Sequence, residues 1–176
     1  DKSQSNYIGR FAPSPTGPLH FGSLIAAVSS YVDARSKNGI WLLRMEDLDP
    51  PREPPGAAEL ILDQLLTLGI QWDGEVLYQS SRIEAYQEAL DRLLEEGLSY
   101  KCDCTRAKIK AMGSIYNGSC KGRKISLSKR FAVRVKTLNE LIGFDDKIQG
   151  YYEQDVEKEV GDFVVLRKDK FFAYQL

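Results

Sequence analysis

The chain has 176 residues, 43% of them hydrophobic and 28% charged, with a formal net charge of −1, as in an ordinary soluble globular protein. No apolar run approaches the roughly 20 residues that span a bilayer, and residues 1–6 carry no signal-peptide pattern, so a cytoplasmic protein is the default expectation. We therefore expect a cytoplasmic monomer with no membrane partner.

The first half of the chain alternates between strand and helix signals. Short apolar runs predict strands, and apolar residues at helical spacing predict the segments between them. In chain order, the predicted elements are a strand at 7–12, a helix at 22–37, a strand at 40–45, a proline-rich loop at 50–55, a helix at 57–68, a short strand at 76–78 and a helix at 81–96. This alternation predicts the α/β class, as a Rossmann-type parallel sheet with helices on both faces.

The alternation of strand and helix signals ends at Tyr100. All three cysteines lie between there and about residue 124, and strand signals return at 131–136 and 162–167. We predict three parts: 1–99 as the first half of the catalytic-type domain, 100–136 as a basic insert, and 137–176 as the start of the second half. The apolar run 171–174 suggests a buried strand at the very end, so we expect the chain to be a fragment.

Charge is unevenly distributed along the chain. Between residues 101 and 136 there are eleven lysines and arginines and one acidic residue, Asp103, while the remainder is acidic. A concentrated basic segment is the electrostatic footprint of a polyanion such as RNA. A solvated surface segment is the alternative reading.

The loop at 10–23 joins the first predicted strand to the first helix. Ligands of open α/β sheets bind at the carboxyl ends of strands, and a helix N-terminus there favours phosphate. Gly17 and Gly22 permit close backbone approach, Ser14 and Ser23 offer hydroxyl groups, and His20 is the chain's one histidine. The loop predicts a nucleotide site; a proline- and glycine-rich turn with an incidental histidine is the alternative.

The cysteines form a compact set. Cys102 and Cys104 are separated by one residue, and Cys120 follows closely. Three thiolates leave one tetrahedral position of Zn²⁺ for an oxygen, from water or a side chain. Three buried free cysteines are the alternative, because C-x-C is a weaker signal than paired C-x-x-C.

Several sequence motifs together resemble those of the glutamate branch of the class I aminoacyl-tRNA synthetases, and most closely those of the glutamyl-queuosine tRNA(Asp) synthetases. The segment at 20–23 reads His-Phe-Gly-Ser, where the first signature usually reads H-I-G-H or H-V-G-G. The other matching phrases are 44–52 (Arg-Met-Glu-Asp-Leu-Asp-Pro-Pro-Arg), Trp-Asp-Gly at 72–74, Tyr-Gln-Ser at 78–80, 100–105, and Phe-Ala-Tyr at 172–174. The resemblance covers nearly the whole chain.

The resemblance implies ATP with Mg²⁺, L-glutamate and queuosine-containing tRNA(Asp) as ligands and partners. It implies that His20, Gly22 and Ser23 form the catalytic signature. It assigns the nucleotide to Pro13, Thr16, Gly17, His20, Gly22 and Ser23, and glutamate to Arg10, Phe11, Ala12, Pro13, Ser14, Glu46 and Tyr174. It also implies structural zinc on Cys102, Cys104, Tyr116 and Cys120, with the Tyr116 phenol as the oxygen ligand.

These roles fit the chemistry of glutamate. The guanidinium of Arg10 can bind a carboxylate through two hydrogen bonds, and Glu46 can pair with the ammonium. A mutual Arg10–Glu46 salt bridge is the alternative, and Asp47 and Asp49 could assist Mg²⁺ or be structural. The family's lysine-rich second signature lies beyond this chain, so we expect the isolated chain to be inactive.

Two other functions remain open on the sequence. A glutamyl-tRNA synthetase fragment that charges a tRNA 3′ end shares the fold, pocket and first signature. A non-catalytic, zinc-stabilised RNA-binding module would account for the basic segment but leaves Arg10, Glu46 and the His20 loop unexplained.

Overall fold

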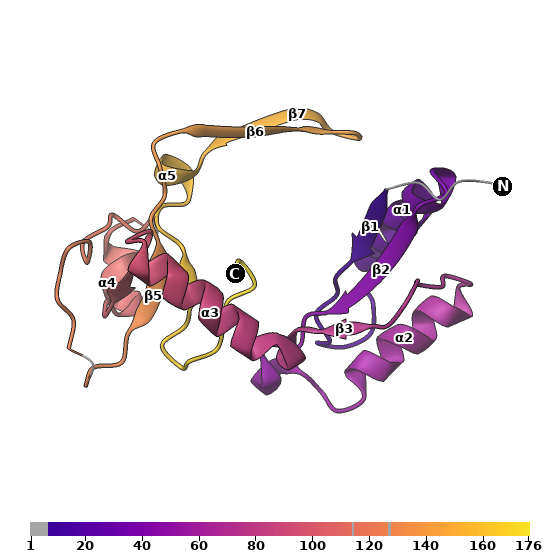
Figure 1. Ribbon diagram of the computed structural model, residues 1–176, viewed down its shortest axis with the longest axis horizontal. Helices are drawn as coiled ribbons and strands as arrows, with labels where there is room; N and C mark the ends of the chain where they lie inside the picture. The colour runs from indigo at the N-terminus through magenta and orange to yellow at the C-terminus, as the bar shows by residue number, and fades with distance from the viewer. Residues whose placement is uncertain (1–6, 114, 127) are drawn as a thin grey trace. The chain divides into compact units, whose positions relative to one another are not determined.

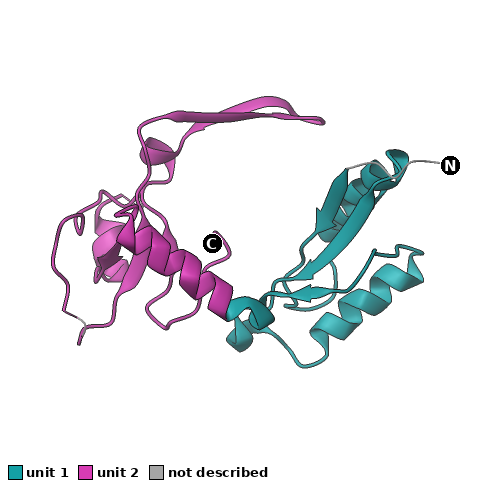
Figure 2. Ribbon diagram, viewed as in Figure 1, with its two compact units in different colours: residues 1–83 teal, residues 84–176 magenta. Residues whose placement is uncertain are grey.

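The computed structural model describes residues 7–113, 115–126 and 128–176, so the polar start at 1–6 lies outside the described residues. The chain forms two compact units, residues 1–83 and 84–176 (Figure 2). In the described part of the chain, no helix is both long and apolar enough to cross a membrane.

The first unit is a three-stranded parallel sheet with the order β1-β2-β3 (Figure 1). Its strands are β1 (Ile8–Phe11), β2 (Ile40–Met45) and β3 (Leu77–Tyr78), and the connecting helices are α1 (Phe21–Ser36) and α2 (Ala57–Thr67). A short 3₁₀ turn, η1 (Pro50–Arg52), lies in the predicted proline-rich loop. The parallel α/β arrangement predicted for this half is confirmed, and β2 has the predicted bounds.

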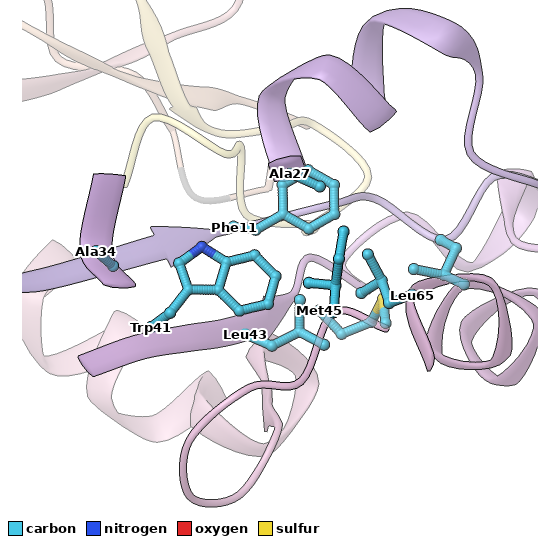
Figure 3. Packing of buried hydrophobic residues seen from close by; sticks show 9 residues of the cluster. Phe11, Ala27, Ala34, Trp41, Leu43, Met45 and Leu65 are labelled. Carbon is cyan, nitrogen blue, oxygen red and sulfur yellow. The ribbon is translucent and has the colours of Figure 1, made fainter. Parts of the chain in front are cut away.

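The core of this unit lies on one face of the sheet. Trp41, Leu43 and Met45 alternate along β2 and are buried against residues from both helices (Figure 3), including Ala27, Ala34, Ile61 and Leu65. Each large apolar side chain contributes about 1.5–3 kcal/mol when fully buried. Because α1 and α2 share this cluster, both cover the same face of the sheet. The helices predicted for the opposite face remain a prediction.

A glycine lets β1 and the start of β2 approach closely. A Cβ atom on Gly39 would lie 2.4 Å from the carbonyl oxygen of Tyr7, which no other residue could tolerate without a backbone shift. Next to it, the Nε1–H of Trp41 donates to Ser30 Oγ on α1 at 3.0 Å, so the one polar atom of the buried indole is satisfied. The hydrogen bond fixes α1 relative to the sheet.

The second unit is built on an antiparallel sheet with the order β4-β5-β8. Its strands are β4 (Ser99–Cys102), β5 (Ala132–Val135) and β8 (Val164–Leu166), and a separate hairpin is formed by β6 (Leu141–Asp146) and β7 (Gly150–Asp155). The turn η2 (Gln79–Arg82) ends the first unit and leads into α3 (Ile83–Glu95), and the further helices of the second unit are α4 (Arg106–Ala111) and α5 (Val156–Glu159).

Three expectations for this part need correction. The strands predicted at 131–136 and 162–167 exist, but β5 is antiparallel to both of its neighbours, β4 and β8, because no long crossover helix of the described residues connects it to either. The strand β4 and the hairpin β6–β7 were not predicted. The run 171–174 is not a buried strand: Phe172 makes one bridge to Leu166, and Tyr174 is 75% exposed.

A buried carboxylate ties the segments of the second unit together. Asp162 is 2% exposed and accepts hydrogen bonds from the Tyr100 hydroxyl, from the Thr137 N–H at 2.9 Å and from the Thr137 hydroxyl at 3.0 Å. Lys121 Nζ lies 3.0 Å away. Burial alone would raise the pKa of Asp162, but these donors hold the pKa below its usual value. The charged form therefore links β4, the cysteine segment and the start of β8.

Candidate active site and candidate metal centre

The loop after β1 and the start of α1 line an open cavity of about 410 Å³. The structure brings all six predicted nucleotide-binding residues to this cavity, together with four of the predicted glutamate-binding residues. The cavity is also lined by four residues that the sequence reasoning did not assign: Pro18, Leu19, Ala26 and Ile61. The full lining is Phe11, Ala12, Pro13, Ser14, Thr16, Gly17, Pro18, Leu19, His20, Gly22, Ser23, Ala26 and Ile61. The roles of these residues remain predictions.

His20 caps the N-terminus of α1. Its Nδ1 accepts the backbone N–H of Ser23 at 3.2 Å, and its Nε2 lies 3.1 Å from the Ser23 hydroxyl. A neutral imidazole with its proton on Nε2 satisfies both contacts. The ring also lies over Gly22, where a Cβ atom would be 3.1 Å from His20 Cε1. The spacing of His20, Gly22 and Ser23 therefore fixes the imidazole at the cavity wall.

The helix behind this cap suits an anion. α1 is 16 residues long and has no acidic residue in its first turn. Its N–H groups and dipole therefore present uncompensated positive potential at the cavity. A phosphate in the cavity would meet this potential and the Ser23 hydroxyl.

The predicted glutamate residues are only partly brought together. Arg10 is exposed on β1, beside Leu42 of β2 in the strand register. Glu46 directly follows β2, and its N–H donates to the Pro13 carbonyl at 2.9 Å, which joins it to the cavity loop. Neither side chain lines the 410 Å³ cavity, and Tyr174 belongs to the second unit.

The acidic motif after β2 has other protein partners. Glu46 pairs with Arg44 at 2.6 Å, in place of the Arg10–Glu46 bridge considered as the alternative. Asp47 accepts the N–H of Ser80 at 2.9 Å and also its hydroxyl. These contacts support the structural reading of Asp47, which fastens the start of η2 to the end of β2. Asp49 likewise contacts the exposed Arg52.

The three cysteines converge in the second unit. The sulfur atoms of Cys102, Cys104 and Cys120 lie within 4.8 Å of one another, and all three residues are buried. The Cys104 and Cys120 sulfurs are 3.5 Å apart, and the Tyr116 hydroxyl lies 3.5 Å from Cys102 Sγ and 3.9 Å from Cys104 Sγ. Each of the four predicted ligand atoms therefore faces the same point.

These spacings suit a tetrahedral ion. Zn²⁺ bonds of about 2.3 Å to sulfur and about 2.0 Å to oxygen place sulfur atoms roughly 3.8 Å apart and sulfur and oxygen roughly 3.5 Å apart. The Cys104–Cys120 sulfur separation of 3.5 Å and the two sulfur–oxygen separations of 3.5 and 3.9 Å are close to these values, and all three sulfur atoms lie within 4.8 Å of one another. Cys102, Cys104, Cys120 and Tyr116 therefore form a donor set that fits zinc.

The surroundings of the cluster favour one thiolate. Burial alone would raise the pKa of Cys120, but the hydrogen bonds around its sulfur, first that with Tyr116, lower the pKa to about 7. Arg123 Nη1 lies 3.1 Å from this sulfur and 3.1 Å from Asp103 Oδ1. Burial raises the pKa of Cys104, as it does for Tyr116. A bound cation would offset that burial cost.

A parallel sheet whose first loop and first helix line an open cavity is the arrangement of nucleotide-binding α/β domains. The family described as tRNA synthetases class I (E and Q), catalytic domain, matches residues 8–176. The chain therefore belongs to this family.

Two curated relatives carry a more specific name than the family as a whole. The chain is 50% identical over 174 residues to the Glutamyl-Q tRNA(Asp) synthetase of Pseudomonas entomophila, covering 99% of this chain and 59% of that protein. It is 51% identical over 176 residues to the protein of the same name from Escherichia coli, covering 100% of this chain and 57% of that protein. The chain thus spans slightly under three-fifths of the length of these relatives.

Solved structures agree on the fold. A glutamate tRNA ligase from Elizabethkingia meningosepticum, crystallised in complex with its amino acid, matches with a TM-score of 0.81 at 25% identity, covering 97% of this chain and 40% of that chain. The glutamate-tRNA synthetase of Elizabethkingia anophelis matches with the same TM-score and identity, covering 41% of that chain. The class I synthetase catalytic fold predicted from the sequence is confirmed.

Proposed function

We propose that the chain is the glutamate-activating part of a ligase that forms glutamyl-adenylate from L-glutamate and ATP and transfers glutamate to the queuosine base in the anticodon of tRNA(Asp). The observation that carries this proposal is about 50% identity, over 99% of the chain, to proteins named for that substrate. We expect the intact protein to act as a cytoplasmic monomer.

The cavity at the α1 N-terminus supports ATP as the first ligand. An oxygen of the glutamate α-carboxylate attacks the α-phosphorus, the new C–O–P bond forms, and the bond to the pyrophosphate oxygen breaks. His20, Ser23 and the helix N-terminus hold the phosphates, while Arg10 and Glu46 orient the amino acid. Mg²⁺ bound with ATP would neutralise charge on the phosphates. The protein contributes positioning and charge stabilisation rather than a covalent step.

We also propose that Cys102, Cys104, Tyr116 and Cys120 hold a structural zinc ion, which makes the basic segment 100–136 a small zinc-binding insert. The sulfur and oxygen spacings support this assignment. The ion would order a segment rich in lysine and arginine, whose charge suits RNA phosphates. The non-catalytic RNA-binding alternative does not account for the cavity at 11–23.

A glutamyl-tRNA synthetase that charges a tRNA 3′ end is the second candidate, and the likeness to glutamate tRNA ligase structures favours it. The two reactions share the adenylate and differ only in the acceptor. An experiment that separates the acceptors therefore decides between them.

A charging assay tests the proposal. The full-length protein that contains this chain is incubated with ATP, radiolabelled glutamate and one of four RNAs: queuosine-containing tRNA(Asp), the same tRNA stripped of its 3′ CCA, tRNA(Asp) lacking queuosine, and tRNA(Glu). We expect labelling of the first two only, because the acceptor is the base and not the 3′ end. Labelling of tRNA(Glu) alone would instead support the second candidate.

A further inference from the structure

The ion pair between Arg44 and Glu46 has an unusual feature. Arg44 Nη2 donates to Glu46 Oε1 at 2.6 Å, with the two side chains 25% and 16% exposed. The Nε atom of Arg44 is buried and has no hydrogen-bond partner in the described part of the chain. Within the same described residues, no hydrogen bond engages Glu46 Oε2.

Stability alone does not explain this arrangement. A largely buried ion pair roughly breaks even against its desolvation cost, and a buried donor without a partner adds a further penalty. A buried group that is left unsatisfied in a native protein calls for an explanation, and a binding role is one. The pair lies at the carboxyl end of β2, where open α/β sheets bind their ligands.

The strand register places Arg44 on the same face as the predicted glutamate residue Arg10. Arg10 is paired with Leu42, and Arg44 is two residues further along β2. Side chains alternate along a strand, so these residues project from the face opposite the Trp41 and Leu43 core. Two cations therefore share this edge of the sheet, and one of them is already engaged with Glu46.

We propose that Arg44 is a positioning residue for the amino-acid site, an inference that rests on the proposed function. Arg44 holds one oxygen of the Glu46 carboxylate and leaves Oε2 for the ammonium group of the bound amino acid. Arg10 is left to bind a carboxylate. The hydrogen bond from the Glu46 N–H to Pro13 fixes the backbone, so Arg44 and Pro13 together determine where the carboxylate points.

The test uses ATP–pyrophosphate exchange by the full-length protein carrying Arg44→Met, Arg44→Lys or the control Arg92→Met, which removes an exposed ion pair with Glu96. We expect Arg44→Met to raise the KM for glutamate about tenfold to a hundredfold, as for loss of a charge-assisted hydrogen bond. The KM for ATP should change less than about twofold, because Arg44 does not line the cavity proposed for the nucleotide. Arg44→Lys should recover part of the lost affinity for glutamate, and Arg92→Met should have the same KM for glutamate as the parent protein.

A second measurement separates positioning from direct binding. Glutarate has both carboxylates of glutamate but no ammonium, so its inhibition constant should not change in Arg44→Met. A rise in the inhibition constant of glutarate that parallels the rise in the KM for glutamate would mean that Arg44 binds a substrate carboxylate. An unchanged KM for glutamate would remove any role for Arg44 in the amino-acid site. Either result overturns the inference. A parent protein without glutamate-dependent exchange would instead refute the proposed function.

Discussion

Replacing Glu46 by alanine in the full-length protein is expected to abolish measurable glutamate-dependent ATP–pyrophosphate exchange. The proposed site pairs this carboxylate with the substrate ammonium, and truncating one partner of a largely buried charge pair costs about 2–5 kcal/mol, or roughly 30-fold to several thousand-fold in kcat/KM. The loss is compounded because Arg44 is left without its partner.

Two variants control for damage to the fold. Glu46→Gln keeps the shape and removes the charge, so it should lose exchange almost as completely while its thermal unfolding stays close to that of the parent. Glu75→Ala removes an exposed carboxylate from the same unit and should retain exchange. Normal exchange in Glu46→Ala would show that the amino-acid pocket lies elsewhere.

Freshly purified, reduced protein is expected to contain about one zinc ion per chain, and Cys120→Ala should lose both the ion and the folded cysteine segment. Structural zinc binding is coupled to folding with an apparent free energy of about 10–16 kcal/mol in small domains, so the effect on this segment should be large. Elemental analysis gives the stoichiometry, and hydrogen exchange across 100–136 reports the loss of structure.

The phenol ligand is tested with a matched pair. Tyr116→Phe should weaken zinc binding at least about tenfold, as loss of an inner ligand exceeds the effect of an outer contact. Tyr151→Phe, in the exposed hairpin β6–β7, should not change it. If the reduced, folded protein contained no zinc, the zinc assignment would be wrong and the three cysteines would be buried free thiols.

The features that the sequence predicted well are those encoded by local patterns. β2 was predicted to the residue because Ile40–Met45 is a short apolar run bounded by Gly39 and Glu46. The loop from Pro13 to Ser23 was predicted as a ligand site and lines one cavity, because its glycines and its capping histidine act on neighbouring residues. The cysteine cluster also followed from spacing, since a short segment constrains where three thiols can lie.

The features that the sequence reasoning missed depend on contacts between distant residues. Nothing local shows that β5 pairs antiparallel with both β4 and β8, because pairing depends on which segments lack a crossover helix. The hairpin β6–β7 combines apolar and acidic residues on exposed strands, so it carries no burial pattern. The sequence places Arg44 beside the acidic motif, but only the folded strand end reveals its bond to Glu46.

The most direct test is a crystal structure of the full-length protein with a non-hydrolysable glutamyl-adenylate analogue. We predict that the adenylate phosphate lies at the N-terminus of α1 beside His20, with the ammonium on Glu46 and a carboxylate on Arg10. An analogue that binds with these three side chains out of reach would contradict the assignment of this loop and strand edge as the site of glutamate activation.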